Sequence, residues 1–131
     1  MPGDYPTVTP YLYYEDAGAA MDWLVMAFGF EERMRMENDQ GRVGHGELVI
    51  GDGLVMVGEP GSGYENPNKR GGRATAGVNV YVDDVDAHFE RAKAAGAKIN
   101  EEPSNQDYGD RRYIAEDLEG HDWFFSQQLN Q

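Results

Sequence analysis

The sequence contains no cysteine, few basic residues and no long apolar run, and each of these absences excludes a class of protein. Without cysteine the chain forms no disulfide, no thiolate metal site and no cysteine nucleophile. No stretch approaches the roughly 18 consecutive apolar residues of a transmembrane helix, and the N-terminal residues lack a signal-peptide pattern. We therefore expect a single cytoplasmic domain over 1–131, since this length suffices for one core.

Basic residues are outnumbered by acidic ones, 11 to 24, which gives a formal net charge of −13. We expect no nucleic-acid partner and no membrane partner, because binding to phosphate requires positive charge. Two explanations of the acidic excess stay open. The first is a well-solvated surface, suited to high salt given only three lysines; the second is attraction of a cationic ligand.

A strand, a capped turn and an amphipathic helix occur twice in the chain, 68 positions apart. The first copy begins with Tyr-Leu-Tyr-Tyr-Glu-Asp at 11–16, and the second with Asn-Val-Tyr-Val-Asp-Asp at 79–84. Asp16 is a suitable N-cap for the first helix, and Gly29 a suitable C-terminal stop. Apolar residues recur at helical spacing in both copies, so each helix must cover another element. We infer that the chain is two copies of one module.

Each predicted helix is followed by three strand-like segments. We expect helices at 17–28 and 85–95, and strands at 7–14, 30–37, 43–50, 54–57, 77–82, 97–101, 110–115 and 122–126. Residues 1–6 are predicted to be a loose leader and residues 60–75 a mobile linker, because the linker is rich in glycine and proline.

The predicted fold class is therefore α+β. Two βαβββ modules, at about 7–59 and 76–127, should form curved mixed sheets around a groove, with the helices on the outer face.

Alternation along the strands assigns side chains either to the helices or to the groove. Leu48 and Ile50 share the helix side, which leaves His45 and Glu47 on the groove side. This pair is a tentative catalytic site, in which His45 is a general base and Glu47 its orienting carboxylate. Alternatively the pair binds a metal together with partners that the sequence does not identify, or His45 is a hydrogen-bonded structural histidine. The residues predicted to bind a ligand in the groove are Tyr11, Tyr13, Met56, Asn79, Tyr81, Arg111, Tyr113 and Phe124.

Alternatives remain for these residues. The aromatic side chains either fill the concave space as core or hold a flat or cationic molecule by stacking. Arg111 either meets a ligand carboxylate or forms a surface ion pair. Of the other histidines, His121 is expected to cap the last turn and His88 to face solvent, and neither is predicted to bind a metal.

Several segments together carry a family resemblance. They are Thr-Pro-Tyr-Leu at 9–12, Ala-Phe-Gly-Phe at 27–30, Gly-His-Gly-Glu-Leu at 44–48, Val-Asp-Asp-Val-Asp-Ala at 82–87, Tyr-Gly-Asp-Arg-Arg-Tyr at 108–113 and Asp-Leu-Glu-Gly-His at 117–121. The chain resembles the vicinal oxygen chelate superfamily, which includes glyoxalase I, bleomycin-resistance proteins and extradiol dioxygenases. Its first half is most similar to the demethylubiquinone-methyltransferase-like subgroup. The resemblance covers about 7–127 and implies paired βαβββ modules, usually assembled as a homodimer.

Enzymes of this superfamily typically hold a divalent metal with His, Glu or Gln from the first and fourth strands of each module. The resemblance places these positions on Thr9, on or near Met56, on Gly77 and on Phe124. None of these residues offers the imidazole or carboxylate that such a cation prefers. We therefore expect no metal and no other cofactor.

Two functions follow from this resemblance and from the residues. The preferred one is metal-independent binding of a small aromatic or cationic organic molecule in an aromatic-lined groove, as in a bleomycin-resistance protein. The alternative is an enzyme of the lyase, isomerase or dioxygenase type, with an atypical site around His45 and Glu47. A protein kept for assembly or regulation, with a sealed core, is a third possibility.

Overall fold

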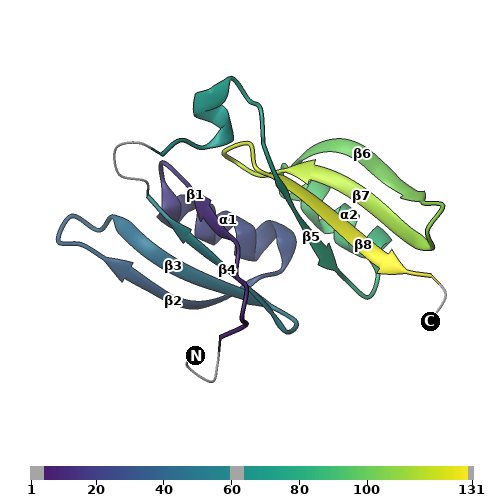
Figure 1. Ribbon diagram of the computed structural model, residues 1–131, viewed down its shortest axis with the longest axis horizontal. Helices are drawn as coiled ribbons and strands as arrows, with labels where there is room; N and C mark the ends of the chain where they lie inside the picture. The colour runs from purple at the N-terminus through teal and green to yellow at the C-terminus, as the bar shows by residue number, and fades with distance from the viewer. Residues whose placement is uncertain (1–4, 60–63, 130–131) are drawn as a thin grey trace.

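The computed structural model describes residues 5–59 and 64–129, which form two four-stranded sheets lying side by side (Figure 1). The first half contains β1 (Tyr11–Tyr13), α1 (Ala17–Phe28), β2 (Glu31–Glu37), β3 (Val43–Ile50) and β4 (Gly53–Gly58). The second contains β5 (Gly77–Tyr81), α2 (Val85–Ala94), β6 (Lys98–Asn105), β7 (Asp110–Glu116) and β8 (Asp122–Gln128). A single-turn 3₁₀ helix, η1 (Pro67–Arg70), lies between them.

The two sheets have the same topology. Their strand orders are β1-β4-β3-β2 and β5-β8-β7-β6, with the first strand of each parallel to the fourth and the other pairs antiparallel. Tyr11 pairs with Met56 in the first sheet, and Asn79 pairs with Phe124 in the second. Asn79 and Phe124 each lie 68 positions after the corresponding residue of the first sheet, Tyr11 and Met56. The α+β class with two βαβββ modules is therefore confirmed.

Local sequence signals position both helices. The Asp16 side chain accepts a hydrogen bond from the Ala19 amide at 3.1 Å, and Asp84 does the same for Ala87 in α2. Gly29 ends α1 with a φ of 85°, a value that favours glycine. No helix in the parts of the chain that the structure describes is long and apolar enough to cross a bilayer.

Side chains of the two helices also join the modules. Arg91 of α2 donates to the carbonyls of Met26 and Val25 at the end of α1, at 2.9 and 3.1 Å. His88 Nε2 donates to the Phe28 carbonyl at 2.7 Å, and Trp23 Nε1 of α1 donates to the carbonyl of residue 95 at 3.0 Å. The last carbonyls of α1, which have no partner inside the helix, are satisfied by the other module.

His88 was expected to face solvent, and that expectation is wrong. Its ring lies between α2, β7 and the end of α1, in contact with Phe125 and Tyr113 at centroid distances of 4.2 and 5.8 Å. His88 is half-buried and lies on the same face of α2 as the buried residues Val85, Phe89 and Ala92, at helical spacing i, i+3, i+4 and i+7.

Strand ends differ from the predicted ones where proline is present. β1 begins at Tyr11 because Pro10 has no amide to donate, although its carbonyl accepts from Met56. β6 continues through Pro103, beyond the end predicted at residue 101, with a register shift between Glu101 and Ser104. The predicted leader and linker include residues 1–4 and 60–63, respectively, and these two segments lie outside the described residues. The remainder of the linker is ordered around η1.

Candidate functional site

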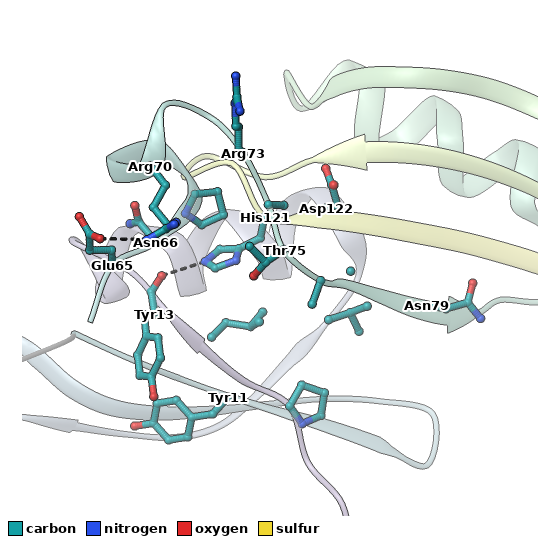
Figure 2. Close-up of a pocket in the computed structure, with 17 residues that line it drawn as sticks. Tyr11, Tyr13, Glu65, Asn66, Arg70, Arg73, Thr75, Asn79, His121 and Asp122 are labelled. Carbon is teal, nitrogen blue, oxygen red and sulfur yellow. Dashed lines mark hydrogen bonds and ion pairs between the residues drawn. The ribbon is translucent and has the colours of Figure 1, made fainter. Parts of the chain in front are cut away.

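A cavity of about 620 Å³ lies at the junction of the two modules, between β1, β5 and the linker (Figure 2). Its lining comes from β1 and the residue before it, the linker, β5 and the start of β8: Pro10, Tyr11, Leu12, Tyr13, Glu65, Asn66, Pro67, Arg70, Arg73, Ala74, Thr75, Ala76, Gly77, Val78, Asn79, His121 and Asp122. The volume is in the range of sites for small organic ligands. Tyr11, Tyr13 and Asn79, three of the predicted ligand-binding residues, line it together.

Four rings follow one another from the first sheet to the linker, and two of them, Tyr11 and Tyr13, line this cavity. His45 lies 5.6 Å from Tyr11, Tyr11 lies 5.6 Å from Tyr13, and Tyr13 lies 4.8 Å from Tyr64, measured between ring centroids. Figure 2 shows the Tyr11 and Tyr13 rings next to one another, with their hydroxyl ends on the same side. We call these four residues the aromatic row. They are contributed by β3, β1 and the linker.

His121 was expected to cap the last turn, but its side chain does not do so. Its Nε2 instead donates to the Tyr13 carbonyl at 2.8 Å (Figure 2), and its ring lies 4.7 Å from that of Tyr14. Because this bond reaches from the β7–β8 turn to β1, it closes the module junction beneath the cavity. No periodic pattern in the sequence indicates such a contact.

The charges around the cavity balance one another. Glu65 pairs with Arg70 at 3.3 Å. Figure 2 shows the Arg73 side chain directed away from the tyrosine rings. On the opposite wall, burial raises the pKa of Asp122, and the charges of Glu116 and Asp117 raise it further. The lining of this cavity therefore carries two acidic side chains, Glu65 and Asp122, and two basic ones, Arg70 and Arg73, beside its rings and neutral polar groups.

His45 and Glu47 lie together on the helix-free face of the first sheet, as predicted. Glu47 is only 3% exposed. It accepts hydrogen bonds from His45 Nε2 at 3.0 Å and from the Tyr5 hydroxyl at 3.0 and 3.2 Å. Arg33 lies 3.5 Å from the carboxylate and over the Tyr5 ring. Burial alone would raise the pKa of Glu47, but these hydrogen bonds and the Arg33 charge lower it below its usual value.

Tyr11 connects this polar cluster to the cavity. Its hydroxyl lies 3.0 Å from His45 Nδ1, on the other side of the imidazole from Glu47. The hydroxyl passes over Gly58 of β4, where an added Cβ would lie 2.6 Å from the phenol oxygen. Burial raises the pKa of Tyr11, and the neighbouring Tyr13 and Glu47 raise it further. Neither Tyr5 nor the contact of Tyr11 with His45 was anticipated.

The helix-free face of the second sheet carries a separate, smaller cavity of about 260 Å³. It is lined by Asn79, Tyr81, Tyr108, Asp110, Arg112, Phe124 and Ser126. The Arg112 guanidinium lies 5.8 Å from the centre of the Phe124 ring and pairs with Glu101 at 3.2 Å. Tyr81 donates to Asp110 at 2.9 Å. The predicted residues Tyr81 and Phe124 are thus brought together here, with Arg112.

Two predicted ligand-binding residues do not face the groove. Tyr113 is completely buried on the helix side, 5.3 Å from Phe89 between ring centroids. Arg111 points to the same side and pairs with Asp86 of α2 at 3.1 Å, which is the surface ion pair that the sequence left open. The strand was assigned one residue out of phase, and Ile114, the partner of Phe124, marks the groove side instead.

The four positions at which the family resemblance implies a metal do not suit one. Thr9 and half-buried Met56 contact each other through oxygen and sulfur at 3.9 Å. At the equivalent place in the second module, the ring of Phe124 fills the space that a side chain at Gly77 would occupy. A hydroxyl, a thioether, a phenyl ring and a glycine are not a donor set for a divalent cation. Within the described ranges, no three His, Cys, Asp or Glu residues are grouped as metal ligands.

Comparisons with known proteins agree with this fold. Residues 6–125 match the family model of the Glyoxalase/Bleomycin resistance protein/Dioxygenase superfamily. An uncharacterised protein of Mycobacterium bovis is 32% identical over an alignment of 131 positions, which covers 96% of this chain and 86% of that protein.

Solved structures are also similar. TioX from Micromonospora sp. ML1 has a TM-score of 0.76 and 38% sequence identity, with 96% of this chain and 98% of TioX covered. The fosfomycin resistance protein FosX from Listeria monocytogenes has a TM-score of 0.69 at 17% identity, over 96% of this chain and 95% of FosX. At that identity the likeness concerns the fold alone.

Proposed function

Because the chain belongs to the glyoxalase/bleomycin resistance protein/dioxygenase superfamily, we propose that it binds a small aromatic or cationic organic molecule in its aromatic-lined groove, without a metal. The observation that carries this proposal is the aromatic row, because two of its rings, those of Tyr11 and Tyr13, line the 620 Å³ cavity. The Tyr11 and Tyr13 rings lie 5.6 Å apart and are tilted by 41° to one another, so a planar ligand in the cavity can stack on one of them and contact the edge of the other.

Stacking and the overall charge support this ligand class in different ways. Each aromatic pair adds roughly 0.5–1.5 kcal/mol beyond the burial of its area, and a tyrosine face also attracts a cation. Since the charged groups lining the cavity balance, they do not select the sign of the ligand's charge. The net charge of −13 instead favours the approach of cations from a distance.

Metal independence is part of the proposal, and the donor set at Thr9, Met56, Gly77 and Phe124 supports it. Membership of the demethylubiquinone-methyltransferase-like subgroup stays a prediction that rests on the His-Gly-Glu-Leu strand at 45–48. A cytoplasmic location also stays a prediction.

We further propose that two chains form a homodimer whose partner completes the groove. Large apolar side chains around the helix-free faces support this, since Val8 is 82% exposed and Tyr64 and Tyr81 are each 56% exposed. An enzymatic role around His45 and Glu47 is the second candidate, favoured by the contact of Tyr11 with His45.

The binding proposal is tested with proflavine, a planar aromatic cation, by calorimetric titration and by quenching of tyrosine and tryptophan fluorescence. We expect micromolar binding that EDTA does not change. Tyr13→Leu should weaken it roughly 2- to 10-fold, because the substitution removes one stacking partner. Tyr108→Leu is the matched control, since Tyr108 is exposed and does not line this cavity.

Three results would contradict the proposal. One is an absence of both heat and quenching at millimolar dye. Another is an equal loss of affinity in the two variants, which would indicate non-specific adsorption to exposed tyrosines. The third is loss of binding in EDTA, which would overturn metal independence.

A further inference from the structure

Three polar groups form a continuous hydrogen-bonded chain on the helix-free face of the first sheet. The Tyr11 hydroxyl lies 3.0 Å from His45 Nδ1, and His45 Nε2 lies 3.0 Å from a Glu47 oxygen. His45 and Glu47 share a face because they are two residues apart on β3, while Tyr11 reaches them from β1 across Gly58.

The partners of Glu47 determine where the protons in this chain lie. Because the hydrogen bonds from His45 and Tyr5 and the Arg33 charge hold Glu47 ionised, its oxygen only accepts. His45 Nε2 must then carry the proton of that bond. In the neutral imidazole Nδ1 is an acceptor, so the Tyr11 hydroxyl donates to it. A second acceptor site on the Tyr11 oxygen remains for a ligand.

The three hydrogen-bonded residues differ in their exposure to solvent. Glu47 is 3% exposed, whereas Tyr11 is 42% exposed and lines the cavity at the module junction. A molecule stacked on the aromatic row can therefore reach the phenol oxygen without reaching the carboxylate. The arrangement resembles a nucleophile, a base and an orienting acid, with tyrosine at the accessible end.

We propose that Tyr11, His45 and Glu47 form a proton relay that ionises a hydroxyl group on the ring of the bound ligand, so that the groove takes a phenol or an enol as its anion. This inference rests on the proposed binding function and specifies its ligand class. The ligand's O–H bond breaks and its electron pair stays on the ligand oxygen. Its proton moves to the Tyr11 oxygen while the Tyr11 proton moves to His45 Nδ1. No oxidant, reductant or further reactant is required.

The surrounding charges favour this final state. The imidazolium that forms lies between the ligand anion, relayed through Tyr11, and the buried Glu47 carboxylate, and opposite charges at such distances stabilise each other. The other titratable groups that face the cluster are Tyr5 from the leader, Arg33 from β2 and Tyr13 from β1. Tyr11 itself stays neutral, in keeping with the raised pKa of its phenol.

The test uses 4-nitrophenol, whose anion absorbs visible light. Equilibrium dialysis measures how much dye the protein retains, and a pH titration of the absorbance gives the pKa of the retained dye. We expect that pKa to fall by about one unit relative to free dye, a tenfold shift in the ionisation equilibrium. ¹⁵N NMR should show one ring N–H on His45 in the free protein and two when the dye is bound.

Variants separate the relay from simple binding. Tyr11→Phe keeps the ring but removes the hydroxyl, so it should retain the dye and lose the pKa shift. His45→Gln should give the same result. Tyr108→Phe is the matched control, because it removes an exposed phenol hydroxyl that neither lines this cavity nor belongs to the relay, and it should keep the shift.

Retained dye with an unshifted pKa overturns the relay and leaves the binding function standing. So does an unchanged shift in Tyr11→Phe, or a His45 ring that stays singly protonated with dye bound. Dye that dialyses away freely, while proflavine is still bound, overturns the assignment of a ring hydroxyl to the ligand. If neither dye is retained, the binding function itself fails.

Discussion

His88 shows how a single half-buried side chain makes the stability of the protein depend on pH. Its Nε2 donates to the Phe28 carbonyl at 2.7 Å, and its Nδ1 accepts from the Tyr113 hydroxyl at 2.6 Å. Burial lowers the pKa of His88, and the charge of Arg91 lowers it further, against a smaller opposing effect of the Phe28 carbonyl. The ring is therefore held neutral, with its proton on Nε2. Protonation of Nδ1 would require the loss of the hydrogen bond that Tyr113 donates to it.

This arrangement predicts a loss of stability on mild acidification. As pH falls below about 6.5, the usual pKa of histidine, the unfolded chain binds a proton that folded His88 resists. The free energy of unfolding should therefore decrease with pH until the lowered pKa of folded His88 is reached. Urea unfolding at pH 7.5 and 5.5 should show a larger decrease for the wild type than for His88→Gln. An equal decrease in both proteins would show that other groups cause it.

Strand alternation predicts the groove side of His45 and Glu47 correctly but misplaces Arg111 and Tyr113. A period of two has two phases, and only the pairing register decides between them. The 68-residue repeat could not supply it, because it places Ala115 at the position of Glu47, whereas Ile114 is the residue that pairs with Phe124 as Glu47 pairs with Met56. The contact of Tyr5 could not be predicted, since the leader has no periodicity that places the Tyr5 hydroxyl beside the Glu47 carboxylate.

At the scale of elements, the end of α1 depends on a side chain from α2. The last turn of α1 contains no basic residue of its own. Arg91 instead supplies the positive charge and two donors, to Met26 and Val25. A cation at this end is favourable because of both the unpaired carbonyls and the helix dipole.

Arg91→Ala should therefore destabilise the protein by roughly 1–2 kcal/mol, since it leaves two terminal carbonyls without their donor. Denaturant midpoints from circular dichroism would measure this loss. Arg73→Ala is the matched control, because Arg73 is exposed and makes no hydrogen bond or ion pair with the residues that the structure describes. Similar midpoints for the two variants would contradict a capping role.

Element boundaries were predictable where local chemistry sets them. The bounds of α1 agree with the prediction at both ends, since Asp16 and Gly29 encode start and stop. Strand boundaries depend on a partner elsewhere in the chain, which alternation cannot supply. β6 therefore runs beyond its predicted end, where β7 still pairs with Ser104 and Asn105.

At the scale of the whole molecule, the two-module fold followed from the repeat, but the cavity did not. The linker that lines it has no periodic pattern, and the contacts that fix the modules are scattered through the sequence. Trp23 with the carbonyl of residue 95, and His121 with the carbonyl of Tyr13, join positions that no local rule connects.

The proposed homodimer is the prediction that belongs to this scale. Light scattering during size-exclusion chromatography should give about twice the chain mass of 14.6 kDa at micromolar concentration. Burial of exposed apolar residues such as Tyr64 and Tyr81 would drive the association. A mass of one chain across the accessible concentration range would contradict it.

The two modules share a topology, but the residues at their corresponding positions differ. Corresponding strands carry Tyr11 and Met56 in one half but Asn79 and Phe124 in the other, although their pairing is the same. The helix-free face of the first module carries His45 hydrogen-bonded to Glu47, whereas that of the second carries Arg112 over the Phe124 ring. A ligand that contacts both modules would meet different side chains at its two ends, so it would bind in one orientation although the backbone scaffold is nearly symmetric.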